Sequence, residues 1–173
     1  MPNKLINSRL GAVFSTDPAV ALWTVIKNNW TNSTGYTVPT QATVKFDIKF
    51  GAFKGFFYYV IVENMPNFIK PQILGNSRYV YEDKKRLQVL AIGSDAKDKK
   101  WKMERHIESI VNGNPTLAQT TYGIDVVTIS DFTEIPTEEI DSTTTNLNPT
   151  KGFHKARSFA TVTMRWEQES VVI

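Results

Sequence analysis

Cysteine is absent from the 173 residues of this chain, and histidine occurs only twice. The absence of thiols excludes disulfide bridges and thiolate metal sites, and it leaves the redox compartment open. No run approaches the roughly 20 consecutive apolar residues that a membrane-spanning helix needs. Residues 1–7 also lack the apolar core of a secretory signal. We therefore expect a soluble protein that is made in a cytoplasm.

The motifs that accompany common catalytic and ligand-binding sites are missing as well. The sequence holds no Gly-rich dinucleotide or phosphate loop, no paired-histidine zinc motif and no calcium-binding loop. His106 and His154 have no partner at a motif spacing, so we interpret each as a partly exposed side chain. The sequence thus predicts no catalytic residue, no cofactor and no metal site.

The composition is that of an ordinary folded domain. Hydrophobic residues make up 41% of the chain and aromatic residues 12%, which is enough to build a core. Twenty basic and 17 acidic side chains leave a net charge of +3, which neither requires nor excludes a nucleic-acid partner. The length predicts a single domain over residues 1–173, with residues 1–15 and 131–156 as appendages.

The segment Arg86–Asn112 is the best-marked unit of the chain. It predicts a short strand, Arg86–Ile92, then a Gly-Ser-Asp turn and one long helix. Ser94 or Asp95 is expected to cap the free N–H groups of this helix, and Gly113 is expected to end it with a positive φ. An apolar stripe along one helical face is formed by Met103, Ile107, Ile110 and Val111.

The other apolar segments predict one further helix and several strands. A Ser-Thr-Asp-Pro start signal predicts the helix Asp17–Asn29. Alternating or apolar runs predict strands at Ala42–Phe50, Phe56–Val62, Tyr79–Tyr81, Ile124–Ile129 and Ala160–Glu167. The second of these is apolar on both faces and is therefore expected inside the sheet. The predicted fold class is α+β: a mostly antiparallel β-sheet packed by two α-helices.

A polar segment, Asp131–Lys155, precedes the last strand. It lacks internal periodicity, which predicts either an extended arm between two strands or a loop without fixed structure. Its acidic residues are Glu134, Glu138, Glu139 and Asp141. Their spacing does not match a calcium loop, so a solvated or partner-facing loop is the favoured interpretation.

Basic residues gather in three places, and one tryptophan lies among them. The basic groups are Lys84, Lys85 and Arg86; Lys97, Lys99, Lys100, Lys102 and Arg105; and Lys151–Arg157. The helical lysines surround the apolar stripe instead of forming one face, which favours a solvated helix over a DNA surface. Trp101 projects away from the stripe, beside Lys97 and Arg105. Either the helix begins later, or Trp101 faces outward as a contact with another subunit.

This order of elements resembles the tail terminator (tail completion) proteins of long-tailed viruses. The resemblance lies in the capped helix at 17–30, the two strands that follow it and the strand-turn-helix unit Arg86–Asn112. It continues in the two C-terminal strand patterns, Tyr122–Ser130 and Arg157–Glu167, which a long acidic loop separates. The chain departs from the family pattern in the connection Asn64–Asn76 and in its apolar N-terminal segment.

The resemblance implies a structural virion protein of the tail or neck, without catalytic activity. Members of that family form rings, commonly hexamers, which cap the tail tube and join it to the head-tail connector. The implied partners are therefore further copies of this chain, the tail tube protein and the connector protein, with packaged DNA close by in the lumen. The residues that we expect at contacts are Phe14, Trp30, Trp101, Arg105, Glu134, Glu138, Glu139, Asp141 and Phe153.

Three alternatives remain open. A tail tube or head-closure subunit would also use a sheet flanked by a helix. A small nucleic-acid-binding module would use the basic residues between Lys84 and Arg105, and its affinity would fall steeply with salt. A small enzyme is the third alternative, and it would place His106 or His154 in a polar cleft.

Overall fold

The computed structural model describes residues 18–48, 56–65, 72–73, 78–117, 124, 126–135 and 154–169. Within these residues the chain forms two α-helices, one 3-10 helix and a mixed seven-stranded sheet. The helices are α2 (Pro18–Asn28), the 3-10 helix η1 (Gln41–Thr43) and α3 (Ala96–Gly113). The strands are β1 (Val44–Asp47), β2 (Tyr58–Asn64), β3 (Gln72–Ile73), β4 (Arg78–Gly93), β5 (Val126–Ile129), β6 (Thr133–Ile135) and β7 (His154–Glu169).

The sheet is organised around two long strands. β4 and β7 pair antiparallel over their whole lengths, from Arg78 opposite Glu169 to Gly93 opposite His154. The order across the sheet is β1-β2-β4-β7-β5, with β3 on β4 and β6 on β7. β1 and β2 are parallel, and the other pairs are antiparallel. The predicted α+β class, with a mostly antiparallel sheet and two helices, is confirmed.

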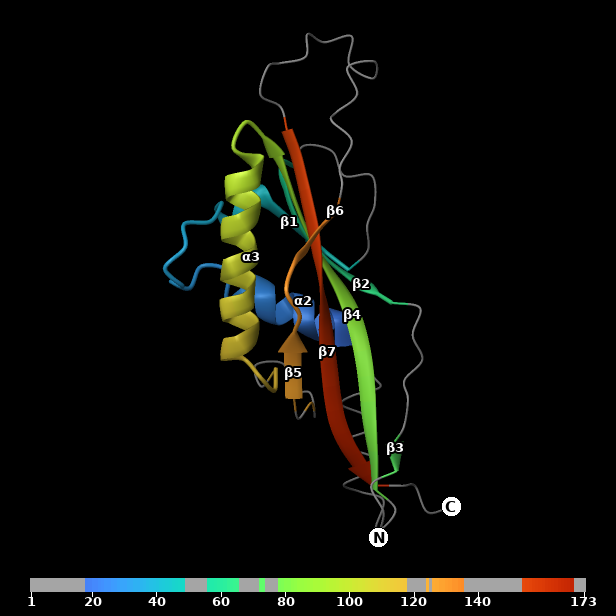
Figure 1. Ribbon diagram of the computed structural model, residues 1–173. Coiled ribbons are helices and arrows are strands. Elements are labelled where there is room, and N and C mark those ends of the chain that lie inside the picture. The colour runs from blue at the N-terminus through green and yellow to red at the C-terminus, as the bar shows by residue number, and fades with distance from the viewer. Residues whose placement is uncertain are drawn as a thin grey trace.

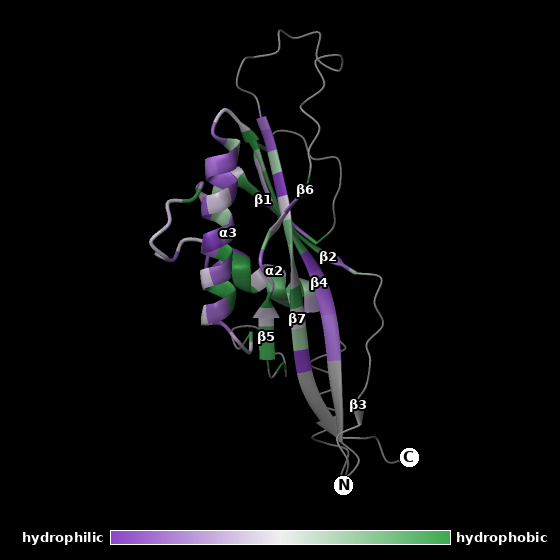
Figure 2. Ribbon diagram, in the orientation of Figure 1, coloured by the Kyte–Doolittle hydropathy of each residue, from purple (hydrophilic) through white to green (hydrophobic). Residues whose placement is uncertain are grey.

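Both helices cover the same face of this sheet (Figure 1). Val60 of β2 and Val89 of β4 lie opposite each other on that face and are buried beneath the helices. The whole predicted stripe of α3 is buried in the same cluster, as the hydrophobic inner side of α3 in Figure 2 indicates. β2 is interior to the sheet and its residues Tyr59–Val62 are buried, as predicted from their apolar run.

The strand that leads into α3 is much longer than predicted. Arg86–Ile92 is only the last part of β4, which begins at Arg78. The charged stretch before Arg86 is polar, as Figure 2 shows, but β7 pairs with all of it and fixes it as a strand. Gly93 then has a φ of 141°, a value that favours glycine, and the chain turns there into α3.

The ends of α3 differ from the predicted caps. Asp95 is the N-cap residue, but its side chain makes no capping hydrogen bond, so the predicted Ser94 or Asp95 cap is wrong. Gly113 is the last helical residue instead of a residue beyond the helix with a positive φ. Asn114 is the C-cap residue, and its N–H donates to the carbonyl of Val111 at 3.1 Å. A 3-10-type bond therefore replaces the expected glycine cap.

The polar segment before the last strand is partly ordered in the sheet. Thr133–Ile135 forms β6 and pairs with Arg157–Phe159 of β7, and β7 begins at His154. Of the two alternatives for this segment, an extended arm or a loop without fixed structure, the loop is therefore wrong at both ends, where the chain is extended in the sheet. Residues 136–153 lie outside the described part of the chain. Among the described residues, no helix is long and apolar enough to cross a membrane.

Candidate interaction surfaces

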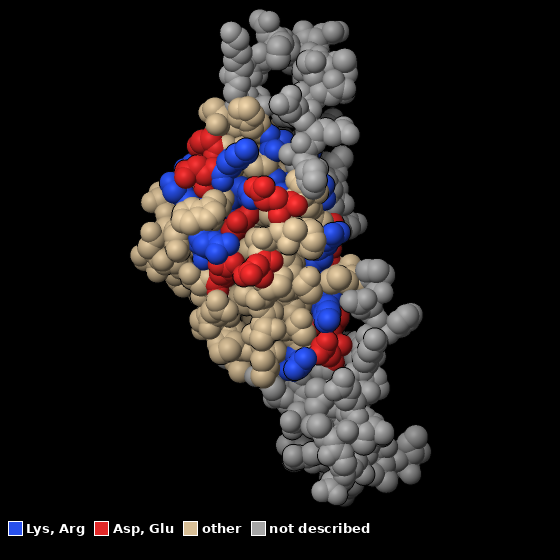
Figure 3. Space-filling view, in the orientation of Figure 1, with Lys and Arg blue, Asp and Glu red and all other residues tan. Residues whose placement is uncertain are grey.

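The outer surface of α3 carries an exposed aromatic pair. Trp101 is 49% exposed and Tyr36 is 36% exposed. Their ring centroids lie 5.7 Å apart at an interplanar angle of 81°, which is an edge-to-face contact. Trp101 thus faces outward, and α3 begins at Ala96 instead of later. Over the side of the molecule that carries α3, basic and acidic side chains are interspersed (Figure 3).

A buried histidine fixes the loop that carries Tyr36. His106 is only 1% exposed, so the prediction of a partly exposed side chain is wrong. Its Nε2 lies 2.8 Å from the carbonyl oxygen of Trp30, and its Nδ1 lies 2.6 Å from Oγ1 of Thr34. Because a carbonyl can only accept, Nε2 carries the proton and Nδ1 accepts from the Thr34 hydroxyl. Burial lowers the pKa of His106, and this favours the neutral form of the ring.

Trp30 belongs to the core and not to a contact surface. It is 2% exposed, and its Nε1–H donates to the carbonyl of Pro39 at 2.8 Å. Its ring packs edge-on against Phe46 at 5.1 Å and against His106 at 4.8 Å. The prediction of Trp30 as a contact with a neighbouring subunit is therefore wrong. The apolar face of the first helix continues through Trp30 into the core.

Arg105 is held by acidic residues of its own helix. Its NH1 lies 3.0 Å from Glu108 and its NH2 lies 3.9 Å from Glu104. Burial raises the pKa of Glu108, and the Arg105 charge opposes that rise. Arg105 follows Trp101 by four positions on the helix. It therefore places a partly buried positive charge next to Trp101.

A buried ion pair joins α3 to β7 and to β6. Lys100 is 4% exposed, although the sequence suggested a solvated lysine. Its Nζ lies 2.9 Å from Glu104 Oε1 and 3.1 Å from Glu134 Oε1. Ser158 of β7 donates to the same Glu104 oxygen at 2.5 Å. The hydrogen bond and charge of Lys100 hold the pKa of Glu134 below its usual value. Glu134, expected at a partner contact, thus ties β6 to α3.

The first basic group does not form one surface either. Lys85 lies on the helix-covered face, where its Nζ is 2.9 Å from Asp83 and 2.5 Å from Asn64 Oδ1. Lys84 lies on the opposite face, because successive strand residues alternate. Glu82, on that opposite face, pairs with Arg165 at 2.7 Å. The basic stretch is therefore divided between the two faces of the sheet, which disfavours a continuous DNA surface.

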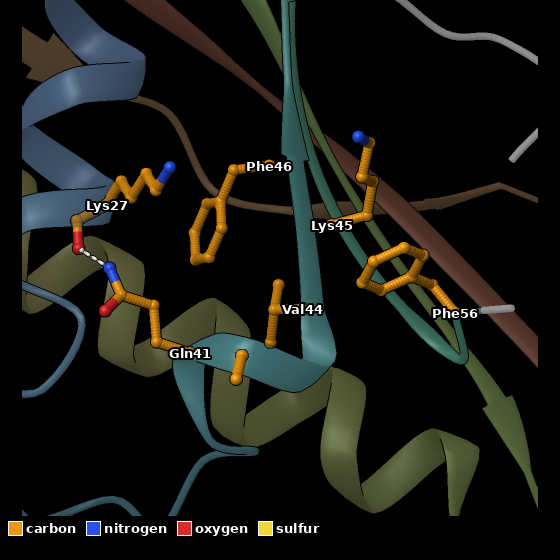
Figure 4. Close-up of a pocket in the computed structure, with 7 residues that line it drawn as sticks. Lys27, Gln41, Val44, Lys45, Phe46 and Phe56 are labelled. Carbon is orange, nitrogen blue, oxygen red and sulfur yellow. Dashed lines mark hydrogen bonds between the residues drawn. The ribbon is translucent and has the colours of Figure 1, made fainter.

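A pocket of about 400 Å³ lies beside β1, at one end of the sheet (Figure 4). The described residues that line it come from α2 (Lys27), η1 (Gln41 and Ala42) and β1 (Val44, Lys45 and Phe46). Phe56, two positions before β2, completes this list. Gln41 donates from Nε2 to the carbonyl of Lys27 at 2.7 Å, which holds η1 against the end of α2. The Nζ of Lys45 lies 5.8 Å from the centre of the Phe56 ring. The pocket thus has apolar side chains and two lysines.

The remaining predicted contact residues lie outside the described part of the chain. These are Phe14, Glu138, Glu139, Asp141 and Phe153. Tyr36, Lys27 and Gln41 were not predicted as site residues, because each becomes part of a surface only through tertiary packing. The i,i+4 spacing of Lys100 and Glu104 was the one available signal for the buried ion pair. Within the described residues, no group of three or more histidine and acidic side chains could hold a metal ion.

Neither a protein-family model nor a curated protein matches this chain.

Proposed function

We propose that this chain is a structural virion protein of the tail terminator class. In this proposal copies of the chain form a ring, commonly a hexamer in that class, which caps the tail tube and joins it to the head-tail connector. Two findings support it: the α+β architecture agrees with the order of elements on which the resemblance rests, and α3 presents an aromatic pair outward.

The aromatic pair is the single observation that carries the proposal. Exposed tryptophan and tyrosine side chains that are held rigidly are typical anchors of protein–protein interfaces. The pair is held from both sides: Trp101 lies in a long helix, and Tyr36 lies in a loop that the His106–Thr34 bond fixes to that helix. A subunit that works by assembly needs such a preformed contact, because little ordering is then required on binding.

The buried polar groups have structural roles that fit a protein without catalysis. His106 joins α3 to the loop after α2, and Lys100 joins α3 to β6. Lys85 joins β4 to β2 through Asn64. Each of these groups links two elements and leaves its polar atoms engaged. In this proposal the chain acts by fitting its surface to neighbouring subunits, and it carries out no bond-making step.

Assembly tests the proposal directly. The full chain should elute as an oligomer in size-exclusion chromatography with light scattering, and it should appear as rings in negative-stain images. With tail tube protein added, the rings should lie at tube ends, and connector protein should bind the opposite side of the ring. A strict monomer that binds neither protein would contradict the proposal. Stacking along the whole tube would instead indicate the tube-subunit alternative.

A further inference from the structure

The pocket beside β1 lies at the edge of the sheet opposite to β6, from which the acidic segment of residues 136–141, here called the acidic arm, continues. β1 is the first strand in the order β1-β2-β4-β7-β5, and β6 pairs with β7 on the side where β5 also lies. The chain leaves β6 at Ile135 and enters the acidic stretch at once. One edge of each subunit thus carries the pocket and the other edge carries the start of the arm.

The two edges are complementary in charge. The described lining of the pocket contains Lys27 and Lys45 and no carboxylate. Residues 134–141 contain four acidic side chains and no basic one, and they include the apolar Ile135 and Ile140. Glu134 forms an ion pair with Lys100. The acidic side chains that the proposal assigns to the pocket are therefore those further along the arm: Glu138, Glu139 and Asp141. An acidic segment with an embedded isoleucine suits a pocket that has both lysines and apolar walls.

The shape of the pocket suits an extended segment. β1 has four residues, and among the described residues β2 is the only strand that pairs with it. Residues from both faces of β1 line the pocket: Val44 and Phe46 from the helix-covered face, and Lys45 from the other. Such a pocket follows the strand edge, where an added chain can use main-chain hydrogen bonds for affinity and side-chain pockets for specificity.

We propose that this pocket binds the acidic arm of a second copy of the chain, with Glu138–Asp141 along β1 and Ile140 in the apolar part. The contact joins opposite edges of two identical subunits, so it is heterologous and can close into a ring. From Ile135 to Asp141 an extended chain reaches at most roughly 20 Å. This inference rests on the proposed ring, and it assigns the contact that links successive subunits.

Charge exchange between two variants tests this contact. The pocket variant carries Lys27→Glu and Lys45→Glu, and the arm variant carries Glu138→Lys, Glu139→Lys and Asp141→Lys. Each variant alone places like charges at every contact, so each should lose the oligomer and remain folded by circular dichroism. An equimolar mixture should restore oligomers, because every pocket then meets an arm of opposite charge. In the matched control, the arm variant is mixed with a Lys99→Glu, Lys102→Glu variant, which keeps the wild-type pocket and arm. The control variant should assemble with itself, whereas the arm variant should stay dissociated, because its basic arm meets a basic pocket in every copy.

Each outcome of this experiment decides the question. Oligomers that survive both sets of substitutions would overturn the inference and leave the ring proposal intact. Restoration only when both sets are combined in one chain, and not on mixing, would assign the pocket to the arm of the same copy and would also overturn it. Failure of both the mixture and the combined chain to assemble would favour another occupant, such as residues 1–17 or a tube segment.

A peptide experiment separates this contact from the ring as a whole. A labelled peptide of residues 134–145 is titrated into the full-length arm variant and followed by fluorescence anisotropy. Binding is expected, and adding the pocket substitutions to the same chain should weaken it about tenfold or more, since they reverse two charges at the contact. If the wild-type chain were monomeric but the peptide bound in this way, the ring would fail, and the pocket would be assigned to the arm of the same copy, which would overturn the contact between copies as well. No binding would overturn the assignment.

Discussion

Lys100 shows how a single buried charge joins three elements. Its ammonium lies between Glu104 of the same helix and Glu134 of β6, while Ser158 of β7 donates to Glu104. Burial of a charge is unfavourable unless partners replace the lost water, and here both partners are carboxylates. The position of Lys100 therefore depends on Glu104, and Glu104 depends equally on Lys100.

Replacement of Lys100 by methionine should destabilise the fold strongly. Lys100→Met leaves the Glu104 carboxylate buried without its cation, so the free energy of unfolding should fall by about 3–5 kcal/mol. Addition of Glu104→Leu should recover most of that loss, because the charge that lost its partner is then removed as well. Urea denaturation measures both variants. The matched control is Lys102→Met, which breaks the exposed pair with Asp98 and should cost about 0–1 kcal/mol. Equal losses for the two lysine variants would contradict this account of the cluster.

His106 should make the stability of the fold depend on pH. Folding lowers the pKa of this histidine below its ordinary value of 6.5. Its contribution to stability is therefore complete above pH 6.5 and is lost as the pH falls below it, because the unfolded chain binds a proton that the folded chain excludes. His106→Gln should flatten this part of the pH profile in thermal unfolding. His154→Gln, at an exposed position, is the control and should leave the wild-type slope. An identical slope in the His106 variant would exclude this role.

At the scale of elements, the periodicity of the sequence was sufficient to predict α3 and β2, but it did not predict where β4 begins. The stripe of α3 and the apolar run of β2 are patterns that burial itself imposes. The first part of β4 carries Glu82–Arg86, and its extension depends on pairing with β7, more than 70 positions away in the sequence. Such pairing is a tertiary effect, so the local sequence does not predict it. The burial of Trp30, whose Nε1–H donates to the carbonyl of Pro39, is a tertiary effect too.

The surfaces were harder to predict than the elements for the same reason. Trp101 was identified because it lies on the side of the helix away from the apolar stripe. The sequence of this one helix is enough to show that. Tyr36 and Lys27 join their surfaces only when a loop or a helix end packs beside another element. β6 was missed because three residues of mixed polarity give no alternation long enough to identify a strand.

The bond between Lys100 and Glu134 should determine how firmly β6 is held. β6 has three residues and lies at the sheet edge on β7, so it should open locally more easily than the long strands. Glu134→Gln removes the charge that Lys100 stabilises, and the exchange of β6 amide protons at pH 7 should rise by up to about fivefold. Exchange in β4 should not change. Hydrogen–deuterium exchange with mass spectrometry measures both, with Asp131→Asn as the control. Unchanged exchange in β6 would show that the pairing with β7 alone holds it.

At the scale of the whole molecule, the fold separates its core from its contact surfaces. The helices cover one face of the sheet, the pocket lies at the β1 end and the acidic arm starts at the other end. The aromatic pair is exposed, whereas the apolar stripe of α3 is buried against the sheet. A subunit with different surfaces at its two edges assembles head to tail, and such contacts form rings when the rotation closes.

Truncation of the aromatic pair should therefore weaken assembly without unfolding the subunit. In the proposed ring, Trp101→Ala with Tyr36→Ala removes a pair of anchors that together contribute about 2 kcal/mol or more to a typical interface, so the dissociation constant should rise about 30-fold or more. The free energy of unfolding should change by no more than about 1 kcal/mol, because both side chains are exposed. Light scattering across a concentration series measures the first quantity and urea denaturation the second. Val126→Ala removes an exposed apolar side chain of β5 and should leave both unchanged. If the aromatic variant assembled like the wild-type chain, the outer surface of α3 would not be the contact, and the ring would have to rest on the two sheet edges alone.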